Sequence, residues 1–183
     1  LRATQAVIRD MGVRVFDMEI IRINKDFAVE AVMPFLDVCG ALQAKAILVA
    51  ADDTEESRLV ENFSAFCEAA AQFNLTADLE FMPWTAVKSA NDAVRILTAA
   101  AQPNGGVLVD SLHAGRSATT LADIAAIPRN WLHYAQVCDA QGPTPLSDSE
   151  LIFTARCARL LPGEGDIDVA GIVAALPDTL PIS

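Results

Sequence analysis

Basic residues are scarce in this sequence, which has 13 Lys and Arg against 24 Asp and Glu and a formal net charge of −11. Nucleic acids and anionic membrane surfaces do not attract an acidic protein, so we expect neither as a partner. The sequence also lacks an apolar run of membrane-spanning length and a charged-then-apolar secretion signal. These absences disfavour nucleic-acid-binding, membrane and secreted proteins.

Cysteine is equally sparse, and its spacing carries no metal or redox motif. The four cysteines are Cys39, Cys67, Cys138 and Cys157, and they form no CxxC pair and no metal-finger spacing. Three of them lie in apolar helix or strand patterns. We therefore expect buried free thiols in a reducing compartment, which favours a cytoplasmic location.

Phosphate-binding motifs are missing as well. Neither GxGxxG nor GxxxxGK[ST] follows the first expected strand, which disfavours a dinucleotide- or nucleotide-binding fold. What the 183 residues do contain is 52% hydrophobic and 20% charged side chains, a composition typical of a well-buried α/β core. No linker or low-complexity tract interrupts it, so residues 1–183 are expected to form a single domain.

Strand-like and helix-like patterns alternate along the chain. The expected strands are 13–21, 44–50, 75–82, 107–112 and 132–139, with a short strand-like connection at 162–166 and a strand beginning at 179–183. The expected helices are 1–10, 27–41 capped by Asp26, 55–73 capped by Asp52–Thr54, 88–101, 119–127, 148–160 and 167–175, with a loop at 140–147. Such alternation, with apolar strands, predicts a parallel sheet covered by helices.

Polar residues recur at the ends of these strands. The strand in VLVDSLHAGR ends at Asp110, with His113 in the following turn, and Glu80, Gln136 and Glu164 lie at intervals of about 30 residues, the length of one strand–helix unit. In a closed barrel these side chains would meet around one centre. The alternative is that Asp110 caps a helix and His113 is a surface loop residue.

The pattern therefore predicts a TIM-type (β/α)8 barrel, which usually needs about 250 residues. With fewer strands than eight, the barrel is expected to be incomplete, lacking its first strand before Leu1 and most of its last strand after Ser183. We expect the native polypeptide to extend beyond both ends. We also expect this chain to show an open seam and a site with three ligands.

Four segments in order, LEFMPWT, VLVDSLHAGRSA, LHYAQVCDA and RLLPGEGDI, resemble the sugar phosphate isomerase/epimerase family of xylose-isomerase-like barrels. The resemblance implies a divalent metal held by Glu80, Asp110 and Gln136, with a fourth ligand, a Glu, on the eighth strand that 179–183 would enter. A Gln where sugar epimerases more often have His is similar to the 3-dehydroshikimate dehydratase branch. The AP-endonuclease relatives hold several metals with many histidines, whereas this chain has 2 His.

Two carboxylates and an amide oxygen suit Mn²⁺ or Mg²⁺ best, with Zn²⁺ as a further option. Such an ion stabilises the enediolate or enolate that forms when a proton leaves beside a carbonyl. Glu80 could be the base, and His113 could donate to a substrate oxygen or serve as base. The competing interpretations are a salt bridge for Glu80 and a backbone-satisfying amide for Gln136.

Other residues are assigned to the substrate. The resemblance implies a substrate-binding Arg, for which we prefer Arg156 to Arg159; a solvated helix face is the alternative for both. Trp84 is expected either to stack on a substrate or to pack in the core. Glu19 is expected to line the pocket.

Four further polar residues have less direct interpretations. Asp52 either lines the pocket or caps a helix, and Asp139 either supports the ligands or caps a loop. His133 is expected at the surface. Glu164 is interpreted as a loop residue near the pocket, because its two flanking glycines point to backbone shape.

Three functions remain open. The first is a metal-dependent isomerase or epimerase of a sugar, sugar phosphate or polyol derivative. The second is a lyase that dehydrates a cyclic keto acid such as 3-dehydroshikimate. The third is a non-catalytic or incomplete barrel that only binds a small molecule or a partner, and self-association into a homo-oligomer is compatible with all three.

Overall fold

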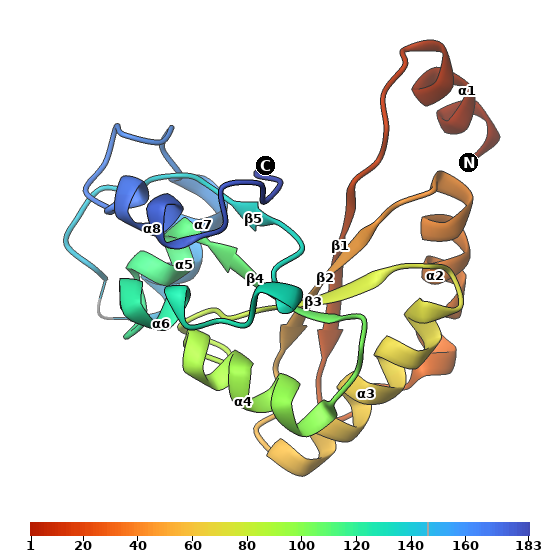
Figure 1. Cartoon of the computed structure of the whole chain (residues 1–183), viewed down its shortest axis with the longest axis horizontal. Helices are drawn as coiled ribbons and strands as arrows, with labels where there is room; N and C mark the ends of the chain where they lie inside the picture. The colour runs from red at the N-terminus through yellow and green to blue at the C-terminus, as the bar shows by residue number, and fades with distance from the viewer. Residues whose placement is uncertain (146) are drawn as a thin grey trace.

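A computed structural model of the chain describes residues 1–145 and 147–183. Its centre is a parallel sheet of five strands in the order β1-β2-β3-β4-β5 (Figure 1). The strands are β1 (Asp17–Ile23), β2 (Ala46–Ala51), β3 (Thr76–Glu80), β4 (Gly105–Asp110) and β5 (Ala135–Gln136). Neighbours in sequence are neighbours in the sheet, as the predicted strand–helix alternation requires.

The central strands β2, β3 and β4 are buried on both faces, and apart from Thr76 and the acids Asp78, Glu80 and Asp110 they consist of apolar and small residues. On the outer face, Ile47, Val49 and Ala51 of β2 pack in a core with helix residues such as Phe63. Burying one such phenylalanine contributes roughly 1.5–3 kcal/mol. On the inner face a second group is buried, comprising Ala46, Leu48, Ala50, Met82, Leu108 and Tyr134, with Trp84 packed against it. Successive residues of β2 thus alternate between the helix-covered face and the face toward the barrel interior.

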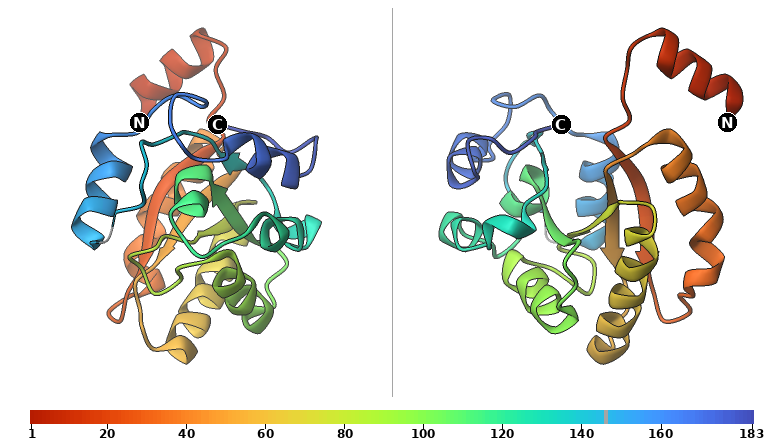
Figure 2. Two further views of the ribbon diagram at one scale, coloured as in Figure 1. Left: turned by 90° about the vertical axis from the view of Figure 1, so that its left-hand side faces the viewer. Right: turned by 45° about the vertical axis from the view of Figure 1, so that its right-hand side comes forward.

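Helices connect the strands. They are α1 (Arg2–Asp10), α2 (Val29–Leu42), α3 (Glu56–Ala71), α4 (Ala90–Ala100), α5 (Ser111–Gly115), α6 (Leu121–Ala125), α7 (Asp148–Cys157) and α8 (Val169–Ala175), with a 3-10 turn at Arg129–Trp131. In Figures 1 and 2, α2, α3 and α4 follow β1, β2 and β3 around the sheet, α5, α6 and α8 gather beyond β4, and α1 stands apart. Figure 2 shows α7 on the other side of the molecule from α6 and α8. No helix in the described residues is long and apolar enough to cross a membrane.

Several predicted boundaries are wrong, and for identifiable reasons. The first strand covers 17–23 and not 13–21, so Glu19 lies inside it and not near its end. Helix α2 is capped by Ala28 without a side-chain hydrogen bond, and not by Asp26. The cap of α3 is Glu55, whose carboxylate accepts the N–H groups of Ser57 and Arg58.

Around the later strands the changes are larger. Asp110 ends β4 and its side chain caps α5, so the residues after it are helical and not strand. The strand predicted at 132–139 is reduced to Ala135–Gln136, and the predicted strand-like 162–166 is absent from the described pairings. Within the loop predicted at 140–147, Leu146 lies outside the described residues. Cys39, Cys67 and Cys138 are buried free thiols, whereas Cys157 is exposed.

The sheet is open, as expected. Among the described residues β1 pairs only with β2, so β1 forms one edge; Phe16 just before it and Ile20 within it are each 39% exposed. At the other side Ile182 forms a parallel bridge with Ala135 of β5. The segment 179–183 is therefore the strand directly after β5, and its assignment to the eighth strand is wrong. The fold is a partial TIM-type barrel.

Candidate active site

The candidate site is formed where the inner face of the sheet reaches the carboxyl ends of its strands. Glu80, the last residue of β3, is in register with Ala50 on one side and Leu108 on the other. Asp110, the last residue of β4, is in register with Gln136 of β5. Because the strands are parallel, these polar residues lie together at the carboxyl-terminal ends of the strands.

Glu80, Asp110 and His113 form the compact part of this site. Each offers one ligand atom within 4.8 Å of the others, and all three are buried. The turn into α5 makes this possible, because the Asp110 carboxylate accepts the N–H of Leu112 at 2.7 Å and so starts the helix that carries His113. The spacing of three residues between Asp110 and His113 therefore becomes a spatial contact, as predicted.

The electrostatics of the cluster are unbalanced. Burial, and next the nearby charge of Asp110, raise the pKa of Glu80 well above its usual range. Burial lowers the pKa of His113 to about 4, so its ring is neutral near pH 7. The 3.5 Å approach of His113 Nε2 to Glu80 Oε1 is therefore not an ion pair between charged groups. His113 Nδ1 is buried without a hydrogen-bond partner.

This arrangement fits a divalent cation. Carboxylate oxygens and an imidazole nitrogen are ligands for Mn²⁺, Mg²⁺ or Zn²⁺. A cation beside Glu80 would also favour the ionised carboxylate that burial and Asp110 disfavour. The donor set and its charge imbalance thus agree with a metal site, while the choice of metal stays open.

The structure brings Arg159, and not Arg156, to the cluster. Arg159 Nη1 donates to Asp110 Oδ2 at 2.6 Å and lies 3.0 Å from Cys138 Sγ. Arg156 is exposed on α7. Helix α7 ends at Cys157, so a position two residues beyond its end leaves the helix face, and helical spacing gives no signal for it.

Gln136 and Glu19 contact each other across the interior. Gln136 Nε2 donates to Glu19 Oε1 at 2.8 Å, so a side chain from within β1 meets one from β5, the first and last strands of the five-strand order. Gln136 lies beside Asp110 in the register, and its role as the third ligand stays a prediction. Glu19 as a substrate-binding residue also stays a prediction.

Trp84 lies against the catalytic histidine candidate. The rings of Trp84 and His113 have centroids 5.0 Å apart and an interplanar angle of 81°, an edge-to-face contact. The indole is half-buried and packs against the inner-face core. Its packing therefore restricts the orientation of the His113 ring, and the predicted stacking on a substrate stays a prediction.

Asp139 organises the loop that follows α7. Its carboxylate accepts four backbone N–H groups, from Ala140, Gly163, Gly165 and Ile167, at 2.8–3.0 Å. A Cβ at Gly165 would collide with Asp139 Oδ1, so only glycine fits there. Of the two predicted roles, the loop cap is the one observed. Glu164 is exposed in this loop, as predicted for a loop residue.

A second buried acid lies two residues before Glu80 on β3. Asp78 is fully buried, its Oδ1 is 2.6 Å from His133 Nδ1, and its Oδ2 accepts the Thr76 hydroxyl at 2.6 Å. Gly106 leaves the space for this pair, because a Cβ there would contact both side chains. The prediction of His133 at the surface is wrong, since its side chain is only 24% exposed. The sequence contains a signal for this position, because residues two apart on a strand face the same side and Asp78 precedes the inward-facing Glu80 by two.

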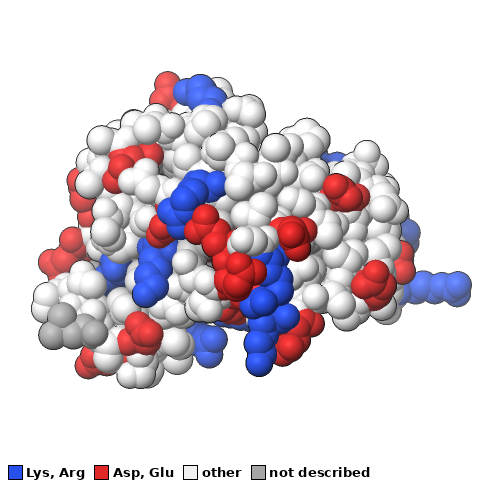
Figure 3. Space-filling model, turned by 90° about the horizontal axis from the view of Figure 1, so that it is seen from below, with Lys and Arg blue, Asp and Glu red and all other residues white. Residues whose placement is uncertain are grey.

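Ion pairs lie near the carboxyl ends of β1 and β2. Figure 3 looks from below in the view of Figure 1, toward the carboxyl ends of β1 and β2, and shows acidic and basic side chains interleaved in a band. Asp52 pairs with Arg22 at 2.6 Å and 2.7 Å, so it is neither the predicted helix cap nor free to bind substrate in this structure. Asp53 pairs similarly with Arg58.

Comparisons with known proteins agree with the fold. A family model described as xylose isomerase-like TIM barrel matches residues 21–179. A 3-dehydroshikimate dehydratase of Pseudomonas putida is 26% identical over 140 residues, covering 76% of this chain and 20% of that protein. One from Pseudomonas aeruginosa is 30% identical over 138 residues, covering 75% of this chain and 20% of its own length. The chain thus spans about a fifth of the length of these curated relatives.

Solved structures show the same architecture. A xylose isomerase-like TIM barrel/4-hydroxyphenylpyruvate dioxygenase fusion protein has a TM-score of 0.86 at 22% identity, covering 100% of this chain and 31% of that one. The IOLI protein with a bound zinc atom has a TM-score of 0.80 at 16% identity, covering 97% and 71%. A D-allulose 3-epimerase from Methylomonas sp. has a TM-score of 0.73 at 15% identity, covering 98% and 66%. At these identities the likeness concerns the fold.

Proposed function

Since this chain belongs to the xylose isomerase-like TIM barrel family, we propose that it uses a divalent metal to remove a proton beside the carbonyl of a small molecule. The observation that carries the proposal is the buried cluster of Glu80, Asp110 and His113. Arg159 pairs with Asp110, whereas the titratable neighbour of Glu80 is a neutral imidazole, so an ionised Glu80 is unfavourable there. A metal ion would give the two carboxylates a common partner. Glu80 and Asp110 would hold the ion with a third donor, for which we propose the Gln136 amide predicted from the sequence, leaving the His113 imidazole beside them for the substrate.

Each residue of the cluster has a role in this chemistry. A bound divalent metal supplies a Lewis acid that stabilises negative charge on the substrate oxygen. His113 is neutral, so it can accept a proton or donate a hydrogen bond to a substrate oxygen, and Trp84 restricts its ring. Glu80 is the base predicted from the sequence, and a cation bound beside it would keep its carboxylate ionised and able to accept a proton.

Between the reactions of this class, we favour dehydration of a cyclic keto acid such as 3-dehydroshikimate. Arg159 places a cation beside Asp110, where it can pair with a substrate carboxylate. The curated relatives, named 3-dehydroshikimate dehydratases, and Gln136 support the same choice. Isomerisation or epimerisation of a sugar, sugar phosphate or polyol is the second candidate. It is supported by the likeness to a D-allulose 3-epimerase and needs the same proton removal.

The test compares both reactions with and without added metal. Loss of water from 3-dehydroshikimate is followed by the absorbance of the conjugated product, and ketose interconversion is measured beside it, each with Mn²⁺ and with a chelator. Glu80→Gln and Asp110→Asn should each lower kcat/KM by about 100-fold or more, and remove the rise in Tm that Mn²⁺ gives the parent by mass action. Glu164→Gln, which removes an exposed carboxylate, is the matched control.

The outcomes separate the three functions. Metal-dependent dehydration supports the lyase, and metal-dependent ketose interconversion supports the isomerase. If neither reaction occurs and Mn²⁺ shifts the Tm of the parent and of Glu80→Gln equally, the cluster is not a metal site. The third function, a barrel that only binds a partner or small molecule, is then favoured.

A further inference from the structure

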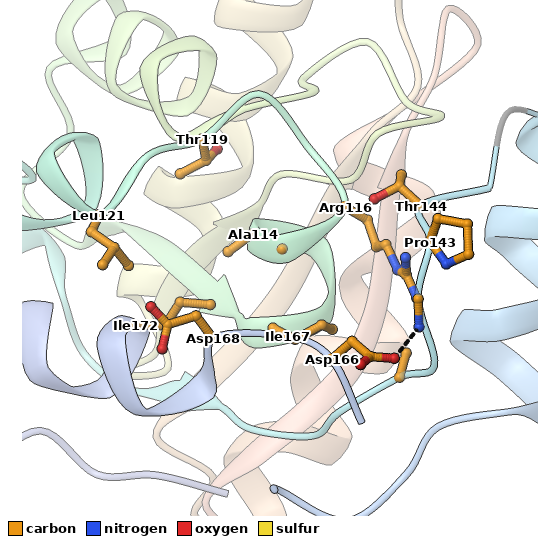
Figure 4. Close-up of a pocket in the computed structure, with 13 residues that line it drawn as sticks. Ala114, Arg116, Thr119, Leu121, Pro143, Thr144, Asp166, Ile167, Asp168 and Ile172 are labelled. Atoms are coloured by element: carbon orange, nitrogen blue, oxygen red, sulfur yellow. Dashed lines mark hydrogen bonds between the residues drawn. The ribbon is translucent and has the colours of Figure 1, made fainter. Parts of the chain in front are cut away.

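A second cavity lies on the outer side of the barrel. It has a volume of about 400 Å³ and lies among α5, α6, the segment 140–144 and the start of α8 (Figure 4). Its volume falls within the range of small-molecule sites. None of Glu80, Asp110 or His113 lines it, so it is separate from the candidate active site.

Arg116 is the unusual residue of this cavity. It is only 7% exposed, and its Nη2 donates to the backbone carbonyl of Gln141. Its Nε is buried without a hydrogen-bond partner, and in residues 1–145 and 147–183 it forms no ion pair. Because a guanidinium keeps its charge at any ordinary pH, Arg116 is a buried cation that lacks a counter-ion.

The two acids of the cavity do not neutralise Arg116. Asp166 Oδ2 accepts the N–H of Gly142 at 2.7 Å, and Asp168 Oδ1 accepts the N–H of Gly171 at 2.9 Å. Both carboxylates are therefore held by the backbone. Their negative charge on the cavity wall disfavours a dianion such as phosphate, so the missing counter-ion is better supplied by a group with a single charge.

The rest of the wall is largely apolar. In Figure 4, Ala114 and Ile167 lie in the middle of the cavity, with Arg116 at one side and Leu121 and Ile172 at the other. A ligand with its charge at Arg116 would lay an uncharged body across these side chains. One anionic end and one apolar body describe a small organic acid.

We propose that this cavity binds a small organic monocarboxylate, with its carboxylate on Arg116 and its apolar body against Ala114, Ile167 and Ile172. The site is distinct from the proposed metal site and does not depend on the proposed function. The ligand carboxylate would be the counter-ion that the Arg116 guanidinium lacks. A guanidinium–carboxylate pair is stronger and more specific than a hydrogen bond between neutral groups.

The experiment titrates the full chain with benzoate and, in parallel, with benzamide, its uncharged counterpart, by calorimetry and thermal shift. Benzoate should bind saturably with Kd below about 10 mM, and benzamide at least about tenfold more weakly. Arg116→Gln should weaken benzoate binding at least about tenfold. Arg129→Gln, which changes an exposed arginine outside the cavity, should leave it unchanged.

Two further variants keep the result decisive. Leu121 is 42% exposed at the cavity, so Leu121→Trp fills the space without touching the guanidinium and should also weaken binding. Glu80→Gln should leave benzoate affinity unchanged, which separates this site from the metal cluster. Equal binding of benzoate and benzamide, absence of saturable binding, or loss of binding in Glu80→Gln and not in Leu121→Trp would each overturn the proposal.

Discussion

Asp139 and Glu80 are both buried carboxylates near the strand ends, and their surroundings differ completely. Burial alone raises the pKa of Asp139, but the N–H groups of Ile167, Gly165, Ala140 and Gly163 outweigh it and hold that pKa below its usual value. Around Glu80, burial and the charge of Asp110 act in the same direction and raise its pKa. The neutral His113 ring lies 3.5 Å from its carboxylate.

The difference separates a structural carboxylate from a reactive one. Asp139 accepts hydrogen bonds from four backbone N–H groups, so its carboxylate stabilises the conformation of the loop that carries them. Glu80 is buried without a comparable set of backbone donors acting on its pKa, so its ionised form is unfavourable until a cation arrives. The predictions below test this contrast.

The largest effect on stability is expected at Asp139. Asp139→Ala leaves four buried N–H groups without their acceptor, so the free energy of unfolding should fall by about 3 kcal/mol or more. Urea unfolding measures it, with Glu164→Ala as the control in the same loop. A loss below about 1 kcal/mol would show that the loop does not depend on the carboxylate.

The next effect concerns turnover. His113→Ala removes the neutral ring beside Glu80, so kcat should fall about 100-fold, while Mn²⁺ affinity changes little because Glu80, Asp110 and Gln136 remain. Kinetics and a metal titration of the same preparation measure the two quantities. A parallel loss of metal affinity would make His113 a ligand instead.

A smaller effect, of opposite sign for the two acids, is expected in the pH dependence of the metal-free protein. Because the folded pKa of Glu80 is raised, its contribution to stability is present below the unfolded pKa of about 4.3 and is lost as the pH rises through the raised folded value. In chelator, Glu80→Gln should therefore match the parent at pH 4 and exceed its stability at pH 8 by about 1 kcal/mol.

Asp139 should behave in the reverse way. Its folded pKa is lowered, so its stabilisation is present above the unfolded pKa of about 3.9 and is lost as the pH falls through the folded value. Asp139→Asn should be less stable than the parent at pH 7 and approach it in acid. Urea unfolding across this range checks both signs, and a Glu80→Gln variant less stable than the parent at pH 8 contradicts the contrast.

The smallest effect is expected among the exposed charges. Arg95 pairs with Glu56 while both side chains are more than half exposed, at 51% and 55%. Water screens such a pair, so Glu56→Gln, which leaves the pair of Arg95 with Asp92 intact, should change the free energy of unfolding by no more than about 0.5 kcal/mol. A larger change in the same unfolding assay would mean that burial is not what distinguishes the strand-end carboxylates.

The position of a residue could be predicted from the sequence where it depends on a single strand and the turn that follows it. Apolar runs located β2, β3 and β4, and the polar residue closing β3 and β4 identified Glu80 and Asp110. The short step from Asp110 to His113 predicted their contact. Each of these inferences needs only local periodicity and the rule that parallel strands share their carboxyl ends.

Prediction failed where tertiary contacts choose between local options. Arg159 reaches Asp110 because α7 stops at Cys157, and the resemblance, which implied an Arg in this segment, did not distinguish it from Arg156. His133 is drawn in by Asp78, a partner 55 positions away. The strand at 179–183 was assigned to the wrong place, because a sequence shows a strand but not its neighbour.

The loop held by Asp139 has a consequence for protein engineering. Its shape is fixed by backbone N–H groups meeting one carboxylate, so the identity of its outward side chains contributes little to that shape. Leu161 is 68% exposed and Glu164 is exposed too, on a segment that begins beside Arg159. A combinatorial library restricted to these two positions, with Gly163 and Gly165 kept, would vary the rim of the barrel while preserving the scaffold that carries it.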